Sequence, residues 1–492
     1  MLRLFDTLTG QKQELVTREP QKVGLYVCGP TVYDYSHLGH ARVYVVFDTV
    51  VRYLRHRGYE VTYVRNFTDV DDKIIARANE RDVEPVALAA EFITAFQEDM
   101  ALLNVGPADV EPKVSDHVPE IVDAIARIER VGLAYARQGT VYFAVRKHDP
   151  YGKLSKRNLD DLCSGARVGV DADKDDPLDF ALWKAAKPGE PHWPSPWGEG
   201  RPGWHIECSA MSTKYLGTEF DIHGGGMDLV FPHHENEIAQ SEAAYASGFA
   251  RFWMHNGFVN LNAEKMAKST GNFFTLRELF KLAEPEAIRL FLLSVQYRHP
   301  INFNVDADQT DGSRFPDLVE AENRLDYFYV TLCKLDDTLG PMAAPGDGEV
   351  VPGVDAAREG FAQAMDDDFN TAAALAPVSE MFKLANRLLE NPKAASKKVR
   401  RRSLWRIREE AHSIGGVLGL WQESPMAYLS RRQEVMARCR GLERAWVEEQ
   451  IVARTEARAA KDFAAADAIR DTLAEKGVEL MDSAQGTRWT VI

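Results

Sequence analysis

The sequence predicts an α/β protein in which a doubly wound parallel sheet is followed by an α-helical bundle and a small C-terminal domain. Strand and helix patterns alternate over residues 22–103, which favours parallel strands joined by helical crossovers. The pattern becomes strongly helical near Pro285, and further helix patterns and a strand-like segment close the chain. A chain of 492 residues is long enough for about three domains.

Four elements begin the sheet domain. They are a strand over Lys22–Cys28, a helix over Leu38–Arg57, a strand over Glu60–Asn66 and a helical run over Asp71–Leu103. The first strand is a short apolar run that Gly29-Pro30 closes, as expected of a buried strand. Gly58 ends the first helix.

An insertion is expected between two halves of the sheet domain. Ala134–Arg146 is typical of a hairpin, whereas residues 160–200 are rich in Asp, Pro, Gly and Trp and show little periodicity. The later expected elements are a strand over Phe220–His223, a helix over His233–Ala246, helices from Pro285 to Trp421 with a Pro/Gly-rich linker over Gly340–Gly353, and a closing strand over Gly486–Ile492.

Composition indicates a soluble globular protein. Hydrophobic residues make up 45% and charged residues 27%, and no stretch approaches the ~18 apolar residues of a membrane span. The N-terminus lacks the apolar core of a secretory signal. Five scattered cysteines argue against a disulfide framework and favour a reducing cytoplasm. Because the net charge is −15, RNA would need a local basic patch; Lys397–Arg402 is a candidate, with a solvated helix face as the equal alternative.

Four residues are of the types that bind zinc: Cys28, Cys208, His233 and Glu237. Cys28 ends the first strand, where doubly wound sheets bind ligands. His233 and Glu237 are four apart on an expected helix and so share a face, whereas His234 has Ile238 at that spacing. The alternative is that the two cysteines are small buried hydrophobes. A metalloprotease is disfavoured because Ile238 replaces the second histidine of H-E-x-x-H.

A second set of residues suits phosphate groups. Segment 30–40 (PTVYDYSHLGH) places His37 and His40 at a helix start, where backbone N–H groups favour an anion and Gly39 allows close approach. Segment 265–272 (KMAKSTGN) carries Lys265 and Lys268, whose charges suit phosphate. The alternatives are a capping turn and an ordinary solvated turn. No P-loop sequence accounts for ATP use.

Together these segments resemble the two signatures of class I aminoacyl-tRNA synthetases. HLGH at 37–40 is similar to the signature HIGH, and KMAKS at 265–269 is similar to KMSKS. Four longer segments narrow the resemblance to the cysteinyl-tRNA synthetase family. These are YVCGPTVYD at 26–34, RNFTDVDDK at 65–73, GWHIECS at 203–209 and HGGGMDLVFPHHENEIAQ at 223–240. The resemblance covers essentially the whole chain and is strongest over residues 20–300.

The resemblance implies roles for particular residues. The family's zinc ligands fall on Cys28, Cys208, His233 and Glu237, with one Zn²⁺ per chain. The expected phosphate contacts are His37, His40, Lys265 and Lys268, and the expected adenosine contacts are Gly224, Gly225 and Gly226. The expected substrate pocket contains Thr68, Trp204, His205 and Asp228. Taken without the resemblance, Thr68 is a helix cap, Asp228 shapes a loop, and the three glycines form a turn. Ala267 stands where the family often has serine, so one hydroxyl contact is lost.

The resemblance also implies the activity. L-Cysteine is activated by ATP, with Mg²⁺, and the cysteinyl group is transferred to the 3′ end of tRNA(Cys), while zinc selects the cysteine thiolate. Cysteine and serine have similar shapes, and an apolar pocket alone discriminates poorly between near-isosteres. A cytoplasmic monomer that does not contact a membrane is expected.

Six regions follow from the same resemblance. They are the first half of a Rossmann-type catalytic domain (1–125), a connective insertion (126–203), the second half of the catalytic domain (204–250), a stem-contact region with the KMSKS-like loop (251–312), a helical bundle (313–425) and an anticodon-binding domain (426–492). The segments 366–370 (DDDFN) and 461–489 resemble the family's helical domain and end segment.

Two other functions compete with this one. An enzyme of the same fold could join activated cysteine to an amino-sugar pseudodisaccharide, as in mycothiol synthesis, but it would not need the region after residue 300 that reads an anticodon. A catalytically silent relative is disfavoured because His37, His40, Lys265, Lys268 and the four metal-ligand candidates are all present.

Overall fold

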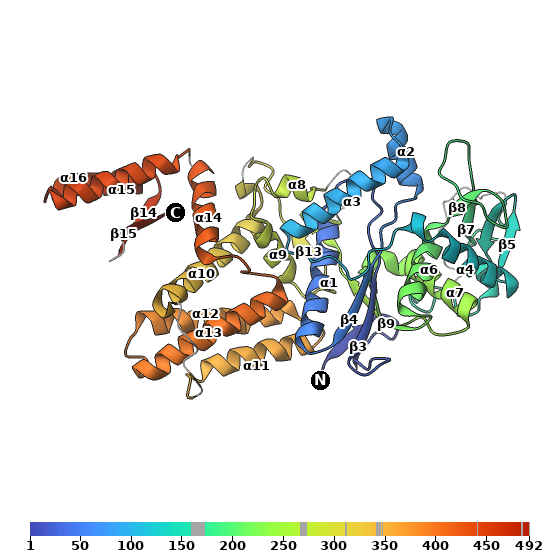
Figure 1. The fold of residues 1–492 in the computed structure, drawn as a ribbon, viewed down its shortest axis with the longest axis horizontal. Helices are drawn as coiled ribbons and strands as arrows, with labels where there is room; N and C mark the ends of the chain where they lie inside the picture. The colour runs from blue at the N-terminus through green and yellow to red at the C-terminus, as the bar shows by residue number, and fades with distance from the viewer. Residues whose placement is uncertain are drawn as a thin grey trace.

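The computed structural model describes residues 1–158, 173–265, 273–309, 312–340, 346, 348–439, 441–483 and 486–491. The molecule is elongated, with the insertion at one end and the C-terminal elements at the other (Figure 1). No helix within these residues is long and apolar enough to cross a membrane.

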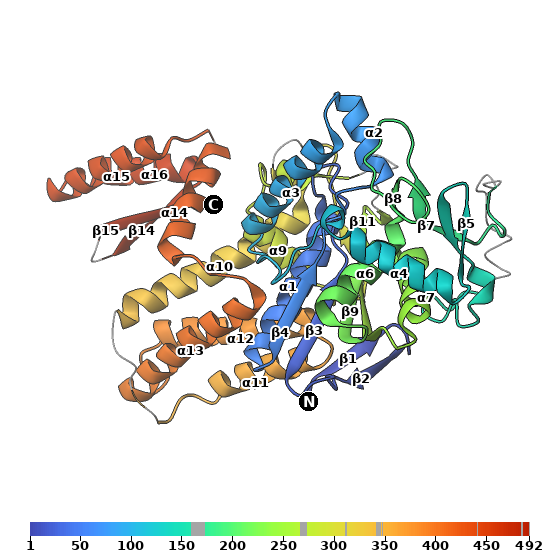
Figure 2. The same ribbon diagram turned by 45° about the vertical axis from the view of Figure 1, so that its right-hand side comes forward.

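A parallel sheet forms the centre of the N-terminal half. Its strands lie in the order β10 (Ala250–Asn256), β9 (Phe220–Gly226), β3 (Lys22–Val27) and β4 (Glu60–Arg65). Helix α1 (Leu38–His56) packs on one face and α6 (Trp204–Leu216) on the other (Figures 1 and 2). The predicted doubly wound sheet is therefore confirmed, and β3 and β9 bring its two halves together.

Alternation along β3 decides which residues reach which face. Leu25 and Val27 belong to the large core that includes α1, whereas Tyr26 and Cys28 belong to the core around α6. This is the period of two expected of a strand, applied to a strand buried on both faces. It directs the Cys28 thiol toward α6, the helix that carries Cys208.

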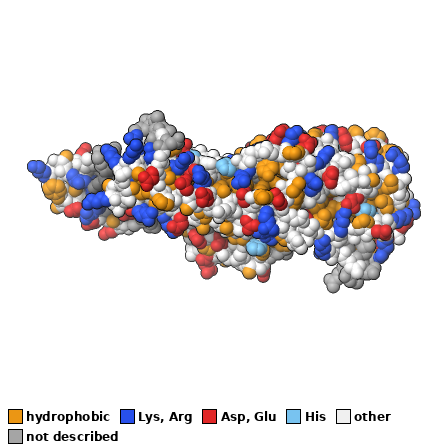
Figure 3. All heavy atoms as spheres, turned by 90° about the horizontal axis from the view of Figure 1, so that it is seen from below, with side chains coloured by type: hydrophobic (Ala, Val, Ile, Leu, Met, Phe, Trp, Pro, Cys, Tyr) orange, Lys and Arg blue, Asp and Glu red, His pale blue; other side chains and the backbone are white. Residues whose placement is uncertain are grey.

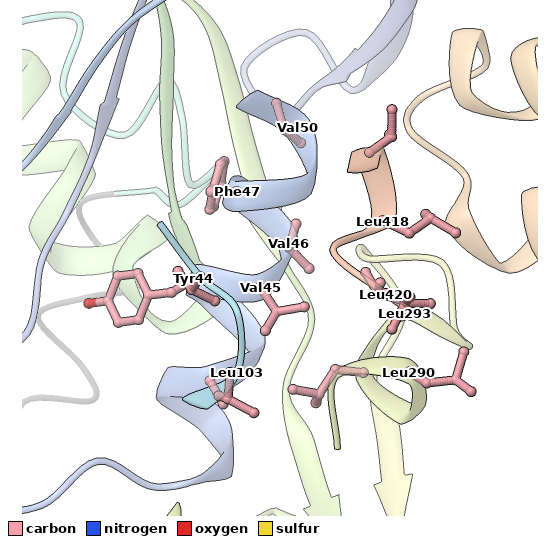
Figure 4. Packing of buried hydrophobic residues seen from close by; sticks show 14 of the residues in the cluster. Tyr44, Val45, Val46, Phe47, Val50, Leu103, Leu290, Leu293, Leu418 and Leu420 are labelled. Atoms are coloured by element: carbon pink, nitrogen blue, oxygen red, sulfur yellow. The ribbon is translucent and has the colours of Figure 1, made fainter. Parts of the chain in front are cut away.

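The other side of α1 joins the sheet domain to the helices that follow. Figure 4 shows Val45, Val46 and Val50 of α1 beside leucines of α9 (Pro285–Leu293) and the segment after α13 (Lys397–Leu418). All these residues lie in one buried cluster that extends into the helical bundle. The position of α1 is therefore set by packing from both sides.

Two parts of the first half differ from the prediction. The single helical run over Asp71–Leu103 is two helices, α2 (Asp72–Arg81) and α3 (Pro85–Leu102), because Asp82 adopts φ +53° and Pro85 starts a new helix. An N-terminal hairpin of β1 (Arg3–Asp6) and β2 (Gln11–Glu14) was not predicted.

The insertion contains more strands than predicted. The expected hairpin is β5 (Ala134–Arg137) and β6 (Thr140–Phe143), and it continues into β7 (Phe180–Ala185) and β8 (Gly200–Pro202) as one antiparallel sheet. Strands β7 and β8 form although residues 160–200 show little periodicity in the sequence. Tertiary contact explains this: Trp183 is fully buried, and a Cβ on Gly200 would lie 2.3 Å from its Nε1.

The remaining elements are mostly helical. A small sheet contains β12 (Glu264–Lys265), β11 (Val259–Leu261) and β13 (Ile301–Phe303). The helical bundle contains α10 (Pro316–Leu339), α11 (Gly353–Asp366), α12 (Thr371–Glu390) and α13. The C-terminal elements are α14 (Pro425–Cys439), α15 (Arg444–Ala459), α16 (Phe463–Glu475), β14 (Val478–Ser483) and β15 (Gly486–Val491). The C-terminal elements have a small core of their own around Val447 and Leu473.

Charges of both signs are mixed on the surface. In the space-filling view, Lys and Arg side chains alternate with Asp and Glu side chains along the whole visible face (Figure 3). The net charge of −15 is therefore not gathered into one acidic region of this face. A polyanionic partner would meet local groups of basic residues rather than a uniform field.

Candidate active site

The four predicted metal-ligand residues meet in the core. The ligand atoms of Cys28, Cys208, His233 and Glu237 all lie within 4.8 Å of one another, and all four residues are buried. Cys28 Sγ is 3.7 Å from Cys208 Sγ and 3.4 Å from Glu237 Oε1, and His233 Nε2 is 3.1 Å from the same oxygen. Both cysteines are free thiols.

Each ligand candidate comes from a different element. Cys28 follows β3, Cys208 lies in α6, and Glu237 lies in the first turn of α7 (Glu235–Tyr245). His233 lies in a π-helical turn over Val230–His234 rather than in α7, so the expected helix begins two residues later than predicted. His233 and Glu237 still face each other across that junction.

A glycine lets the strand ends come together at this point. A Cβ on Gly29 would lie only 1.5 Å from the Asn66 carbonyl oxygen. The Asn66 side chain accepts a hydrogen bond from the Gly29 N–H at 2.9 Å. Because no side chain fits at residue 29, the ends of β3 and β4 can approach closely beside Cys28.

A second ligand group shares two of these residues. Cys28, His223, His234 and Glu237 also present ligand atoms within 4.8 Å of one another. His234 Nε2 is 3.4 Å from Cys28 Sγ, and His223 Nε2 is 2.9 Å from Glu237 Oε2. Helical spacing gave no reason to consider His234, because that argument assumed a regular helix where the chain forms a π turn. No sequence pattern pointed to His223 as a ligand.

Burial favours the neutral forms of the two thiols and of His233 and His234. It raises the pKa of the Cys28 thiol well above its ordinary value, with Cys208 and Glu237 adding to the effect, and it also raises the pKa of Cys208. Burial lowers the pKa values of His233 and His234 well below the ordinary value. Among the described residues, the only basic groups within 4.0 Å of the Glu237 carboxylate are imidazoles. The cluster thus offers the neutral imidazoles of His233 and His234 and two thiols that a metal cation would deprotonate.

Two side chains next to Cys208 hold His233. The Trp204 ring stacks on the His233 ring at 4.3 Å between centroids. His205 Nδ1 is 3.0 Å from His233 Nδ1, and burial lowers the pKa of His205 to about 3. Two of the four predicted pocket residues, Trp204 and His205, therefore contact a ligand candidate. Trp204 also lines the adjacent cavity.

A cavity of about 400 Å³ opens beside this cluster. Five of the predicted nucleotide and substrate residues line it, His37, His40, Trp204, Gly226 and Asp228, whereas Thr68, His205, Gly224 and Gly225 do not. Its polar lining also includes Cys28, Tyr33, Lys73 and Asn256. Backbone of Gly29, Gly39, Gly226 and Gly257 forms further parts of the wall. Lys73 and the Asn256–Val259 wall were not predicted as site residues, although Lys73 ends the family-like segment 65–73.

The helix start at one end of the cavity is capped by histidine. His37 is the N-cap of α1, and its Nδ1 accepts hydrogen bonds from the N–H groups of Gly39 (3.1 Å) and His40 (3.4 Å). The His37 and His40 rings stack at 3.9 Å. The capping interpretation is thus correct for the turn, and the same two rings line the cavity.

Thr68 is buried and bonded to a carboxyl that the sequence did not mark. Its hydroxyl is 2.9 Å from Glu207 Oε2. Burial raises the pKa of Glu207 well above its ordinary value, and Glu207 Oε1 has no hydrogen-bond partner within the described residues. The suggestion that Thr68 caps a helix was wrong, because Asp71 caps α2.

The three glycines at 224–226 form the end of strand β9 and not a turn. A Cβ on Gly224 would lie 2.3 Å from the Phe47 ring, and one on Gly225 would lie 2.9 Å from the His234 ring. Packing therefore explains the first two glycines. Gly226 lines the cavity, and a Cβ there would meet Asp228 Oδ1 at 2.4 Å. Asp228 is exposed at the cavity edge.

The predicted lysines stand at the limit of the described chain. Lys265 ends β12, and its side chain and the whole of Lys268 lie outside the described residues. Where the described chain resumes, Thr275 forms a backbone bridge with His37, and the Leu276 N–H donates to the Ser36 carbonyl at 2.8 Å. The chain that resumes after the undescribed residues thus lies at the start of α1.

Part of the predicted basic patch is structural. Arg402 is buried and donates hydrogen bonds to the carbonyls of Gly346 (3.0 Å) and Glu349 (3.3 Å). Arg400 donates to the Leu388 carbonyl. These two arginines of the run Lys397–Arg402 therefore serve α13 and its neighbours, so the proposed patch is smaller than the sequence suggested.

Comparison with known proteins agrees with this architecture. The family model "tRNA synthetases class I (C) catalytic domain" matches residues 14–310, and "DALR domain" matches residues 360–422. A cysteine–tRNA ligase of Anaeromyxobacter sp. (strain K) is 56% identical, covering 100% of this chain and 99% of that protein. A cysteine–tRNA ligase of Geobacter sulfurreducens is 51% identical with the same coverage.

Solved structures share the fold at low sequence identity. Mycobacterium tuberculosis methionyl-tRNA synthetase in complex with methionyl-adenylate superposes with a TM-score of 0.60 at 16% identity, covering 81% of this chain and 92% of that one. The full-length relatives and the catalytic-domain match lead to one conclusion: this chain belongs to the cysteine–tRNA ligase family of class I tRNA synthetases.

Proposed function

We propose that this chain is a cysteine–tRNA ligase, which activates L-cysteine with ATP and transfers the cysteinyl group to the 3′ end of tRNA(Cys). One observation carries the proposal: the buried Cys28–Cys208–His233–Glu237 cluster reaches, through Cys28, the cavity that the α1 helix start lines. An amino acid held by its side chain at the cluster would have its carboxylate in the same cavity as a nucleotide.

In the first step, a cysteine carboxylate oxygen attacks the α-phosphorus of ATP, and the bond to the bridging oxygen breaks to release pyrophosphate. Such chemistry depends on positioning and on charge stabilisation. His37 and His40 line the cavity where α1 begins. We assign them to the phosphates, and Lys265 and Lys268 to the transition state, with Mg²⁺ accompanying ATP.

The donor set fits zinc. Two sulfurs, one imidazole nitrogen and one carboxylate oxygen suit a tetrahedral site, and we assign one Zn²⁺ per chain to Cys28, Cys208, His233 and Glu237. When bound, zinc supplies a Lewis acid that prefers a thiolate to an alcohol. Trp204 and His205 hold His233. We assign Thr68 and Asp228 to polar contacts with the amino acid.

The second step uses the rest of the chain. The acyl carbon passes from the adenylate to a hydroxyl of the terminal adenosine, and AMP leaves; we assign no protein nucleophile to it. We propose domain boundaries at residues 125, 203, 250, 312 and 425, with residues 426–492 reading the anticodon. We further propose a monomer that works in the cytoplasm. Gly226 is the glycine of its run best placed for the adenosine.

Two reactions test this function. Cysteine-dependent exchange between ATP and pyrophosphate should be present, and charging of tRNA with cysteine should follow. Absence of exchange would mean that this chain is a catalytically silent relative. Exchange without charging, together with ligation to an amino sugar, would show the enzyme of the same fold.

Zinc analysis tests the ligand set. We expect about one zinc ion per chain, lost in Cys208→Ala and in His233→Ala. His234→Ala is the matched variant, because His234 belongs only to the second group. Retention of zinc in His233→Ala and its loss in His234→Ala would move the site to the second group. Full retention in both Cys208→Ala and His233→Ala would reject the proposed set.

A further inference from the structure

A buried arginine lies directly behind the nucleotide cavity. Arg42 follows His40 by two residues in α1, and its side chain is fully buried. It donates to the carbonyls of Phe258 (3.0 Å), Tyr297 (3.2 Å) and His299. Among the described residues no carboxylate lies within 4.0 Å of this guanidinium, and burial lowers the pKa of Arg42 to about 10. A buried cation that binds only carbonyls is costly, so its retention calls for a reason.

The carbonyls bound by Arg42 belong to the cavity wall and to the segment behind it. Gly257 and Phe258 line the cavity. The Gly257 N–H donates to the Tyr297 carbonyl at 2.8 Å, and a Cβ on Gly257 would lie 2.5 Å from the backbone of His299. The wall therefore lies against residues 297–299, and Arg42 bonds to both at once.

The helical bundle holds the same segment from the other side. Asp368, fully buried after α11, accepts hydrogen bonds from the Tyr297 hydroxyl (2.8 Å) and from Arg298 Nε (2.7 Å). It also accepts from the Phe5 N–H at 2.8 Å and from Gln296 Nε2 at 3.1 Å. Residues 296–298 are thus fixed between the bundle and the N-terminal strand β1.

We propose that Arg42 is a positioning residue for ATP: it ties the α1 helix start to the Gly257–Phe258 wall through residues 297–299, which Asp368 holds in place. The inference rests on the proposed function, because it concerns the nucleotide side of that site. Arg42 contacts no reacting atom in this scheme. It sets the distance between the two walls that face the nucleotide, and small errors in such distances reduce rates strongly.

The first test is Arg42→Lys, which keeps the charge but cannot bind three carbonyls in the planar geometry of arginine. We expect the KM for ATP in pyrophosphate exchange to rise at least ~10-fold, while the KM for cysteine and the zinc content stay within ~2-fold. The control is Arg289→Lys, because Arg289 is also buried and donates to carbonyls, of Leu103, Asn104 and Leu418, but none of these three residues lines this cavity. Unlike Arg42, Arg289 also pairs with a carboxylate, that of Asp48. Arg289→Lys should lower the thermal midpoint and leave both KM values unchanged.

A second pair of variants tests whether Arg42 and Asp368 act on the cavity wall through the same segment, residues 297–299. Tyr297→Phe removes only the hydroxyl that bonds Asp368, and Asp368→Asn removes the charge that holds Arg298. Each should raise the KM for ATP less than Arg42→Lys does. Combined with Arg42→Lys, each should add less than its separate factor, because both act through residues 297–299.

Direct binding separates this inference from the proposed function. Calorimetry with a non-hydrolysable ATP analogue should show at least ~10-fold weaker binding to Arg42→Lys than to the unmodified chain. This holds even if the unmodified chain shows no cysteine-dependent exchange, an outcome that would reject only the proposed function. Equal ATP affinity in the two chains, or equal increases in both KM values, would overturn the positioning role. If the separate effects multiply in the double variants, Arg42 and Asp368 do not act through the same segment.

Discussion

The metal-ligand cluster and the nucleotide cavity lie side by side and are built in opposite ways. Cys28, Cys208, His233 and Glu237 are at most 5% exposed and contact one another. The histidines of the α1 start are only half-buried, and four glycines, Gly29, Gly39, Gly226 and Gly257, are among the residues that line the cavity. Buried mutual contacts suit selection of one side chain, whereas an open wall of donors suits a large, charged nucleotide. Substitutions in the cluster should therefore change amino-acid selectivity, whereas substitutions at the cavity should change the use of ATP.

The largest expected effect concerns selectivity at the cluster. If the cysteine thiolate binds zinc, cysteine should exceed serine in kcat/KM for pyrophosphate exchange by ~10⁴-fold or more, since a site built on one polar bond strongly rejects an analogue that lacks it. The measurement is exchange with each amino acid. A ratio near ~100, together with hydrolysis of seryl-tRNA by this chain, would contradict the zinc-selector idea and make the 126–203 insertion a candidate editing site.

The next effect belongs to the nucleotide side. Lys268→Ala should lower the maximal rate of pyrophosphate exchange at least ~100-fold. It removes a positive charge that stabilises the negative charge developing on the phosphates in the transition state. Cysteine binding should barely change. The control is Lys393→Ala, an exposed lysine between α12 and α13. A change confined to the KM for ATP would make Lys268 a ground-state contact instead.

Removal of the elements that follow α14 should affect neither side of the active site. The chain should end after Cys439 and keep α14, because Tyr428 stacks on Tyr329 at 3.8 Å and Arg432 pairs with Glu322 at 2.7 Å. Adenylate formation should persist, while tRNA charging should fall by ~10-fold or more through lost RNA contacts. Equal losses in both reactions would mean that residues 441–492 support folding or chemistry.

The smallest effect is a pH dependence far from both sides. Glu286 accepts from the Tyr329 hydroxyl at 2.7 Å, and burial raises its pKa to about 7 from 4.5. Between these values the unfolded chain is ionised at Glu286 while the folded chain stays protonated. The free energy of unfolding should therefore fall as pH rises from 4.5 to 7, by at most about 3 kcal/mol.

Urea unfolding at pH 5 and pH 7.5 measures this change. Glu286→Gln cannot ionise, so the difference between the two pH values should be smaller in that variant than in the unmodified chain. Equal differences in the two chains would show that Glu286 does not contribute. Pyrophosphate exchange should be unaffected, because Glu286 lies outside both the cluster and the nucleotide cavity.

Local sequence was enough for the elements that carry the site. The apolar run ended by Gly29-Pro30 forms β3, and the pattern before Gly58 forms α1 with His37 at its start. Period and turn chemistry act over a few residues, so they are legible without a structure. The family resemblance added the grouping of Cys208 with Cys28, which spacing alone could not provide.

Tertiary structure decided what depends on contacts between distant segments. His233 and His234 lie in a π turn and both bring a ring nitrogen close to Cys28, and β7 and β8 form because neighbouring strands pair with them. Gly224 is needed because Phe47 packs against it. The hydrogen-bond partners of Arg42 lie far along the chain: Phe258 is separated from it by 216 positions and His299 by 257. Such contacts leave no local pattern, since each residue's environment is supplied by chain that is remote in sequence.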